Sequence, residues 1–259
     1  MTANDKSNKA TREREITAAS FDEVNGDALS ATLGDIEFVR ATLKFAVLKS
    51  EPADLDPWFH SIALFNRAQD TLLSSVHLAR QRVPVDAFAL LRVAVETAAV
   101  AVCITRDRGA FERYLGLSGK KYEATQAIAP VRLLIPRLPE VWGALSQAAI
   151  HTNVRAFGPS RDADGTPAVH MFGREADPVR DRQSLRGVSL AAALVFRAAE
   201  LVLFDESAHI PGWLKLQGSA MHATPTAETL VERRYQEFTS GEHQAAQPAD
   251  AANRPSAGR

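Results

Sequence analysis

Arg92 and Glu96 interrupt the interior of the most apolar stretch of the chain, residues 84–106. They are four residues apart, which is about one helical turn, so a helix places both side chains on one face. Charges in a buried helix must be paired or lie at its rim. The pair could line a pocket where Arg92 binds an anionic group, or it could only order helix packing. Arginine before glutamate is the less favourable order for an ion pair of this spacing, so helix stabilisation alone is a weak explanation.

A second group of polar residues closes a later apolar helix, where residues 145–153 read LSQAAIHTN. Ser146 and His151 are about 140° apart around a helix axis, which places them poorly as a nucleophile and its base. His151 is stabilised by the helix dipole when protonated, and Asn153 can cap the helix end; a functional histidine is the alternative. The candidate catalytic residues are therefore Arg92, Glu96, Ser146 and His151, and the candidate binding residues are Asn153 and Arg155.

We expect no metal and no cofactor. Glu206 and His209 form one E-x-x-H motif, but a di-iron bundle needs two such motifs and two further glutamates. The histidines form no H-x-x-x-H pair, and Cys103 is the single cysteine. The chain also lacks the G-x-S-x-G, P-loop and G-x-G-x-x-G motifs, so neither acyl transfer nor a phosphate cradle has support.

Helical periodicity covers most of the chain and predicts an all-α bundle of about five to six main helices. The expected helices are residues 27–50, 56–82, 84–106, 110–128, 139–151 and 182–206, with a short one near 227–238. Glycine, proline and aspartate break the pattern near 154–181, where we expect a loop or a small hairpin that pairs 154–157 with 169–172. The polar stripe of the last long helix is most simply its solvated face. Its members are Arg186, Ser189, Arg197 and Glu200.

Residues 27–239 are expected to form a single helical domain between a disordered N-terminal segment, 1–26, and a disordered tail, 240–259. The net charge of −1 argues against a sequence-neutral nucleic-acid binder, but it leaves a local basic patch open. One cysteine excludes an intrachain disulfide and fits a reducing cytosol. The first residues lack the apolar run of a secretory signal, and the charge-free helical runs are short for a membrane span. We therefore expect a cytoplasmic protein without a membrane partner.

The run FNRAQDTLLSSVHLARQRVPVDAFALLRVAVETAAV, followed by a helix that ends SQAAIHTN, resembles the bacterial proteins grouped as domain of unknown function 5677. The resemblance covers about residues 58–206, and the matching positions are Leu91, Arg92, Glu96, Ser146 and His151. It implies a helical bundle distantly similar to the HEPN superfamily, many of whose members are RNases of toxin and antiviral systems. Those RNases carry an arginine and then a histidine on one helix. This chain departs from that pattern, because no such histidine follows Arg92.

Together these observations predict a cytoplasmic helical-bundle protein that acts as a binding or accessory module, with a polar pocket around Arg92, Glu96 and His151. This hypothesis requires Arg92 and His151 to approach each other across the bundle. One alternative is a HEPN-like RNase, with His151 as general acid or base, Arg92 stabilising phosphate charge and RNA as the partner. That site should be open and ringed by lysine or arginine. The other alternative is a scaffold that forms a homodimer through an apolar helix face.

Overall fold

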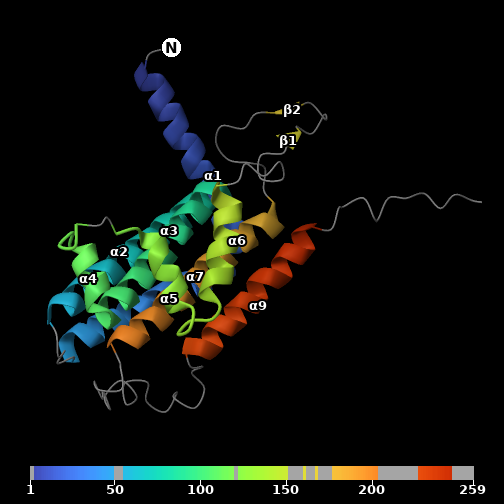
Figure 1. The fold of residues 1–259 in the computed structure, drawn as a ribbon. Helices are drawn as coiled ribbons and strands as arrows, with labels where there is room; N and C mark the ends of the chain where they lie inside the picture. Colours follow the sequence, from blue (N-terminus) through green and yellow to red (C-terminus); the bar gives the residue numbers. More distant parts are fainter. Residues whose placement is uncertain are drawn as a thin grey trace, which may run out of the picture.

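The protein is an all-α bundle in a computed structural model that describes residues 3–49, 55–119, 122–150, 160–161, 167–168, 177–203 and 227–246. The long helices are α1 (Ala3–Lys49), α2 (Leu55–Arg80), α3 (Pro84–Arg106), α6 (Leu138–Ile150), α7 (Pro178–Leu203) and α9 (Ala227–Ala246). Shorter elements follow α3: α4 (Arg108–Tyr114), the 3-10 turn η1 (Ala124–Ala127) and α5 (Ile128–Val131). Figure 1 shows how these elements are arranged. The predicted fold class is confirmed.

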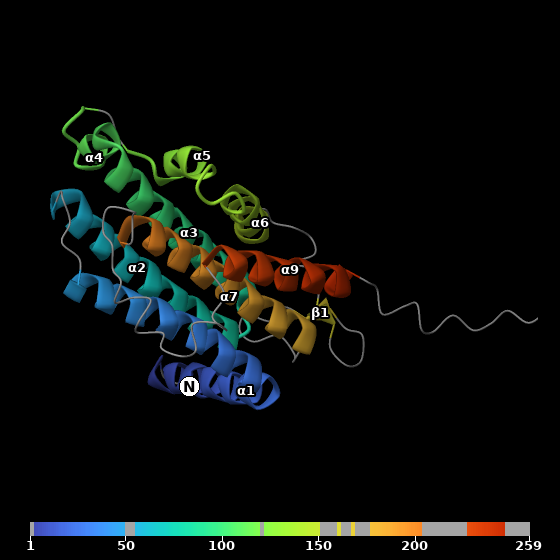
Figure 2. The same cartoon turned by 90° about the horizontal axis from the view of Figure 1, so that it is seen from below.

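The centre of the bundle is formed by α3 and α7. In Figure 2, α5 and α6 lie on one side of α3, while α2 and then α1 lie on the other. Helix α7 packs against α1, α2, α3 and α9. By length and composition α3 could cross a membrane, but 67% of its most apolar window is buried inside the protein. Burial against other helices accounts for an apolar surface of this kind in a bundle core.

Gly187 of α7 allows a close contact between the two central helices. A Cβ atom at this position would lie 2.8 Å from Phe88 Cε1 and 3.3 Å from Leu91 Cδ1, both in α3. We expect Gly187→Ala to lower the free energy of unfolding by about 1–3 kcal/mol, because side chains of a packed core must move to admit the methyl group. Denaturant unfolding of the two proteins measures this difference.

Gly143 of α6 provides a matched control for that substitution. Nothing lies within 4 Å of a Cβ atom built at this glycine. Gly143→Ala should therefore raise the free energy of unfolding by about 0.5–1 kcal/mol, because alanine is the better helix former. Equal effects of the two substitutions would contradict the tight contact at Gly187.

The N-terminal segment is helical, so the expectation of disorder over residues 1–26 is wrong for residues 3–26. Phe21 is fully buried, and Arg80 Nε of α2 donates a hydrogen bond to Asp22 Oδ1 at 2.7 Å. These tertiary contacts stabilise the first part of α1, although its sequence shows no sustained apolar period. Helix α1 kinks at Asn25, where φ is −120° and ψ is 15°, and its first part extends beyond the other helices in Figure 1.

The prediction of a single helix over residues 110–128 is also wrong, because the structure has α4, η1 and α5 there. Helix α4 ends at Tyr114. Gly116 follows with a φ of +75°, which suits glycine, and the chain then turns before η1 and α5. The backbone N–H of Leu117 closes the turn by donating to the carbonyl of Glu112 at 2.9 Å. Gly116 and Gly119 were the available sequence signal for this break.

A hairpin does interrupt the helices between α6 and α7. Strand β1 (Ser160–Arg161) pairs antiparallel with β2 (Pro167–Ala168), and Ser160 faces Ala168. These strands lie nearer the turn than expected, and the predicted pairing of 154–157 with 169–172 falls outside the described residues. At the other end of the chain α9 continues to Ala246, so residues 240–246 are helical and not part of a disordered tail. The rest of that tail, 247–259, falls outside the described residues.

The polar stripe of α7 is not simply a solvated face. Ser189 is buried, and its hydroxyl donates to Thr32 Oγ1 of α1 at 3.1 Å. Arg197 and Glu200 form an ion pair whose side chains are only about a quarter exposed. Because α7 is surrounded by neighbouring helices, most of its polar groups must bond within the protein.

Candidate functional site

Arg92 and Glu96 form an ion pair on one face of α3. Arg92 Nε donates to Glu96 Oε1 at 2.9 Å, and the two side chains are 20% and 13% exposed. They therefore lie at the rim of the core, with most of their surface removed from water. The four-residue spacing predicted the shared face correctly.

Trp142 of α6 completes this group, and the sequence analysis missed it. Its indole Nε1 donates to the same oxygen, Glu96 Oε1, at 2.7 Å. The Arg92 guanidinium carbon lies 5.2 Å from the centroid of the Trp142 ring, within the range of a cation–π contact. Glu96 thus fixes both the arginine and the indole. The requirement of a buried indole N–H for an acceptor was the available signal.

Ser146 lies one turn after Trp142, on the same face of α6. Its hydroxyl donates to the Trp142 carbonyl at 2.7 Å, so its proton is used within the helix. This bond makes Ser146 a polar neighbour of the site and a poor nucleophile, because an attacking hydroxyl needs a base as its hydrogen-bond partner.

The other predicted site residues, His151, Asn153 and Arg155, lie outside the described residues. Helix α6 ends at Ile150, so His151 is the next residue along the chain. The approach of His151 to Arg92 stays a prediction. The structure brings Arg92, Glu96 and the helix of Ser146 together at the contact between α3 and α6.

The geometry of this group suits the binding of an anion. Arg92 uses Nε for Glu96, and its two terminal amino groups make no hydrogen bond to any residue in the described parts of the chain. Such a fork of N–H donors matches a carboxylate or phosphate. Within the same parts, no group of three His, Cys, Asp or Glu side chains could hold a metal ion.

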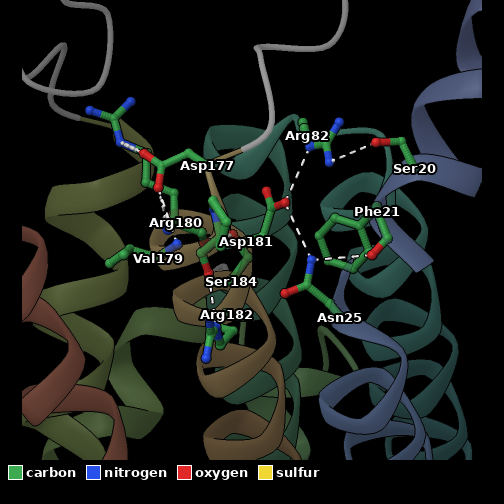
Figure 3. Close-up of polar contacts among 11 residues, drawn as sticks. Ser20, Phe21, Asn25, Arg82, Asp177, Val179, Arg180, Asp181, Arg182 and Ser184 are labelled. Carbon is green, nitrogen blue, oxygen red and sulfur yellow. Dashed lines mark hydrogen bonds and ion pairs between the residues drawn. The ribbon is translucent and has the colours of Figure 1, made fainter. Parts of the chain in front are cut away.

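A second polar cluster joins α1, the α2–α3 turn and the start of α7 (Figure 3). Arg82 Nε donates to Asp181 Oδ2 at 3.2 Å, and these side chains are 7% and 6% exposed. Asn25 Nδ2 donates to the same carboxylate oxygen at 3.3 Å, and Arg82 also reaches Ser20 Oγ at 3.4 Å. The kink of α1 is thereby tied to the other two segments.

This buried cluster has the character of a structural junction. Burial raises the pKa of the Asp181 carboxyl above its usual value, although Arg82 and Asn25 act in the opposite direction. Arg82 has a φ of +55°, a conformation that a residue with a Cβ adopts only when its surroundings impose it. The adjoining cavity of about 20 Å³ has room for about one water molecule. Neither Arg82 nor Asp181 belongs to a pattern that the sequence analysis singled out.

No protein-family model, curated protein or solved structure matches the chain. The function must therefore be argued from the site itself.

Proposed function

We propose that the protein is a binding or accessory module that takes a small anionic group on Arg92, at the contact between α3 and α6. The observation that carries this proposal is the fixed guanidinium: Glu96 bonds its Nε, Trp142 lies against it, and its terminal amino groups have no bonded partner among the described residues. A preorganised arginine loses little conformational entropy on binding a ligand. His151, which directly follows α6, is proposed to complete the site.

An RNase is the less favoured alternative. Its site should be open and ringed by basic side chains, whereas the Arg92–Glu96 pair is mostly buried and Glu96 offsets the arginine charge. A polyanion is bound chiefly through several cationic contacts to its backbone. One compensated arginine fits a single small anion better than an RNA strand. The resemblance to domain of unknown function 5677 remains a proposal on the same motif residues.

An NMR titration with sodium phosphate, at constant ionic strength, tests the binding proposal. The indole N–H signal of Trp142, assigned with Trp142→Phe, should shift and saturate. Arg92→Gln should weaken the binding about tenfold or more, because a charge-assisted hydrogen bond is lost. Arg132→Gln is the matched control, since Arg132 is an exposed arginine outside this site.

The phosphate titration and an RNA cleavage assay together decide between the functions. A saturable shift whose apparent affinity falls about tenfold or more in Arg92→Gln and is unchanged in Arg132→Gln supports the anion site. An absent shift, or the same shift in Arg92→Gln, contradicts it. Cleavage of an RNA oligonucleotide by the wild-type protein and not by His151→Ala would replace the binding proposal with the RNase, and no cleavage by either would remove that alternative.

A further inference from the structure

We propose that a groove between α1 and α2 binds a small neutral carboxamide with an apolar body. The groove has a volume of about 540 Å³, which is within the range of small-molecule sites. In Figure 2, α1 and α2 lie on the side of α3 opposite to α6. The groove is therefore separate from the α3–α6 site, and this proposal goes beyond the function proposed above without depending on it.

The Gln69 side chain of α2 supplies the central polar group of the groove. It lines the groove and is only 7% exposed, so more than nine-tenths of its surface is buried. Neither its carbonyl nor its amino group makes a hydrogen bond within the described parts of the chain. Buried polar groups are normally hydrogen-bonded, because burial without a partner costs free energy. A ligand in the groove can supply the missing partner.

The groove is open because α1 has a glycine, Gly34, in its lining. Nothing lies within 4 Å of a Cβ atom built at this position, so a side chain would have free space there. The backbone of Gly34 is helical, and no neighbour is close, so neither a left-handed φ nor tight packing explains the glycine. Glycine within a helix is less stable than alanine. An open binding groove accounts for that cost.

Leucines give the groove an apolar wall on each helix. Leu33 of α1 and Leu73 of α2 line it and are 40% and 44% exposed. Leu73 is one helical turn after Gln69, so the two side chains share a face of α2. A ligand body that packs between the leucines would remove their apolar surface from water.

The charged residues of the groove favour a neutral ligand. Glu37 and Arg40 are the two charged residues that line it, and they bond each other. Arg40 Nε donates to Glu37 Oε2 at 2.8 Å, and Arg40 Nη2 donates to Glu37 Oε1 at 2.6 Å. This two-point contact is the typical geometry of a compensated arginine–carboxylate pair. The lining therefore carries no net charge.

The chemistry of the Gln69 amide selects the complementary group. The amide presents a carbonyl acceptor beside an N–H donor. A primary carboxamide presents the same two groups, so an edge-to-edge pair forms two hydrogen bonds at once. A carboxylate or a tertiary amide has no N–H, and either would leave the Gln69 carbonyl without a partner. A carboxamide with an apolar body therefore uses both the buried amide and the leucine walls.

An NMR titration of the full-length protein with benzamide tests the proposal. The side-chain amide signals of Gln69, assigned with Gln69→Met, and the backbone amide signal of Leu73 should shift and saturate. Benzoate and N,N-dimethylbenzamide keep the ring but lack the N–H donor, so we expect each to bind about tenfold more weakly. Arg92→Gln should leave the affinity for benzamide unchanged, which separates the groove from the α3–α6 site.

Gln69→Met tests the polar partner of the ligand. Methionine has a similar length but no amide, so benzamide should bind about tenfold more weakly. The substitution also removes a buried polar group that has no bonded partner, so it should not lower the free energy of unfolding. Urea denaturation measures this second readout, which separates a binding role of Gln69 from a structural one.

Gly34→Leu tests the open space of the groove. The leucine has room at this position, so the protein should fold, but its side chain should fill the groove and abolish the saturable shift of Leu73. Gly26→Leu is the matched control. Gly26 is also a glycine of α1 with nothing within 4 Å of its Cβ position, and it does not line the groove.

The comparison of the three ligands on the wild-type protein decides the proposal even if a variant fails to fold. Saturable binding of benzamide, about tenfold tighter than that of the other two and lost in Gly34→Leu but not in Gly26→Leu, supports the carboxamide groove. Equal affinities for the three ligands would leave only an apolar groove and overturn the proposal. Tighter binding of benzoate than of benzamide would make Arg40 the main contact and overturn it, and so would the absence of any saturable shift.

Discussion

Arg82→Met should lower the free energy of unfolding by about 3–5 kcal/mol, because it leaves the Asp181 carboxylate buried without its cationic partner. The Asp181 side chain is only 6% exposed, and Asn25 would be its remaining cross-helix hydrogen-bond donor in the described structure. Methionine keeps much of the length of arginine and suits a φ of +55° no better, so the loss of charge is the main change. Guanidinium chloride denaturation followed by tryptophan fluorescence measures the effect.

A double substitution separates the contribution of the ion pair to stability from the cost of leaving one charge buried without a partner. Burial is the dominant influence on the pKa of Asp181 and raises it, so the Arg82 guanidinium does not fully offset the desolvation of the carboxylate. Arg82→Met combined with Asp181→Leu should therefore recover most of the lost stability, as when other buried pairs are replaced by apolar side chains.

The ion pair between Arg80 and Asp22 provides a control that is more exposed than the Arg82–Asp181 pair. Its side chains are 34% and 35% exposed, so Arg80→Met should cost no more than about 1 kcal/mol. Arg82→Met can be compared directly with Arg80→Met. If Arg82→Met lowers the free energy of unfolding no more than Arg80→Met does, the junction does not contain the buried charge described above.

The helices that were predicted correctly are those determined by residues close together in the sequence. Helix α3 has the predicted bounds, 84–106, because a proline starts it and a largely apolar run continues it. The first half of α1 was missed because its cause is distant: Phe21 is buried by other helices, and Asp22 is bonded by Arg80. A segment with one anchored aromatic among polar residues has no period of its own to detect.

The same distinction between local and distant contacts explains which parts of the candidate site were predicted from the sequence. The pairing of Arg92 with Glu96 follows from a spacing within one helix, and it was predicted. The bond from Trp142 to Glu96 joins residues 46 apart, and the pair of Arg82 and Asp181 joins residues 99 apart. No periodicity states which face of one helix meets which face of another, so these partners could be found only in the folded chain.

Leu91→Ala should lower the free energy of unfolding by about 2–5 kcal/mol. Leu91 is fully buried in α3, and its side chain packs at the close contact with Gly187 of α7. Removing it from a tightly packed interface loses apolar burial and leaves a cavity that the central helices are poorly able to close. Urea denaturation measures the loss, and Leu133→Ala, at a leucine that is 82% exposed, should change stability by no more than about 0.5 kcal/mol.

Leu91 and Arg92 are neighbours in the motif but have different surroundings, so their substitutions should separate two roles. Leu91→Ala removes core packing, whereas Arg92→Gln leaves Glu96 bonded to Trp142 and removes a group that is 20% exposed. We expect the first to reduce stability strongly with phosphate binding retained in the folded protein, and the second to do the reverse. If Arg92→Gln destabilised the protein as much as Leu91→Ala, the ion pair would be a structural element and the motif would carry no binding role.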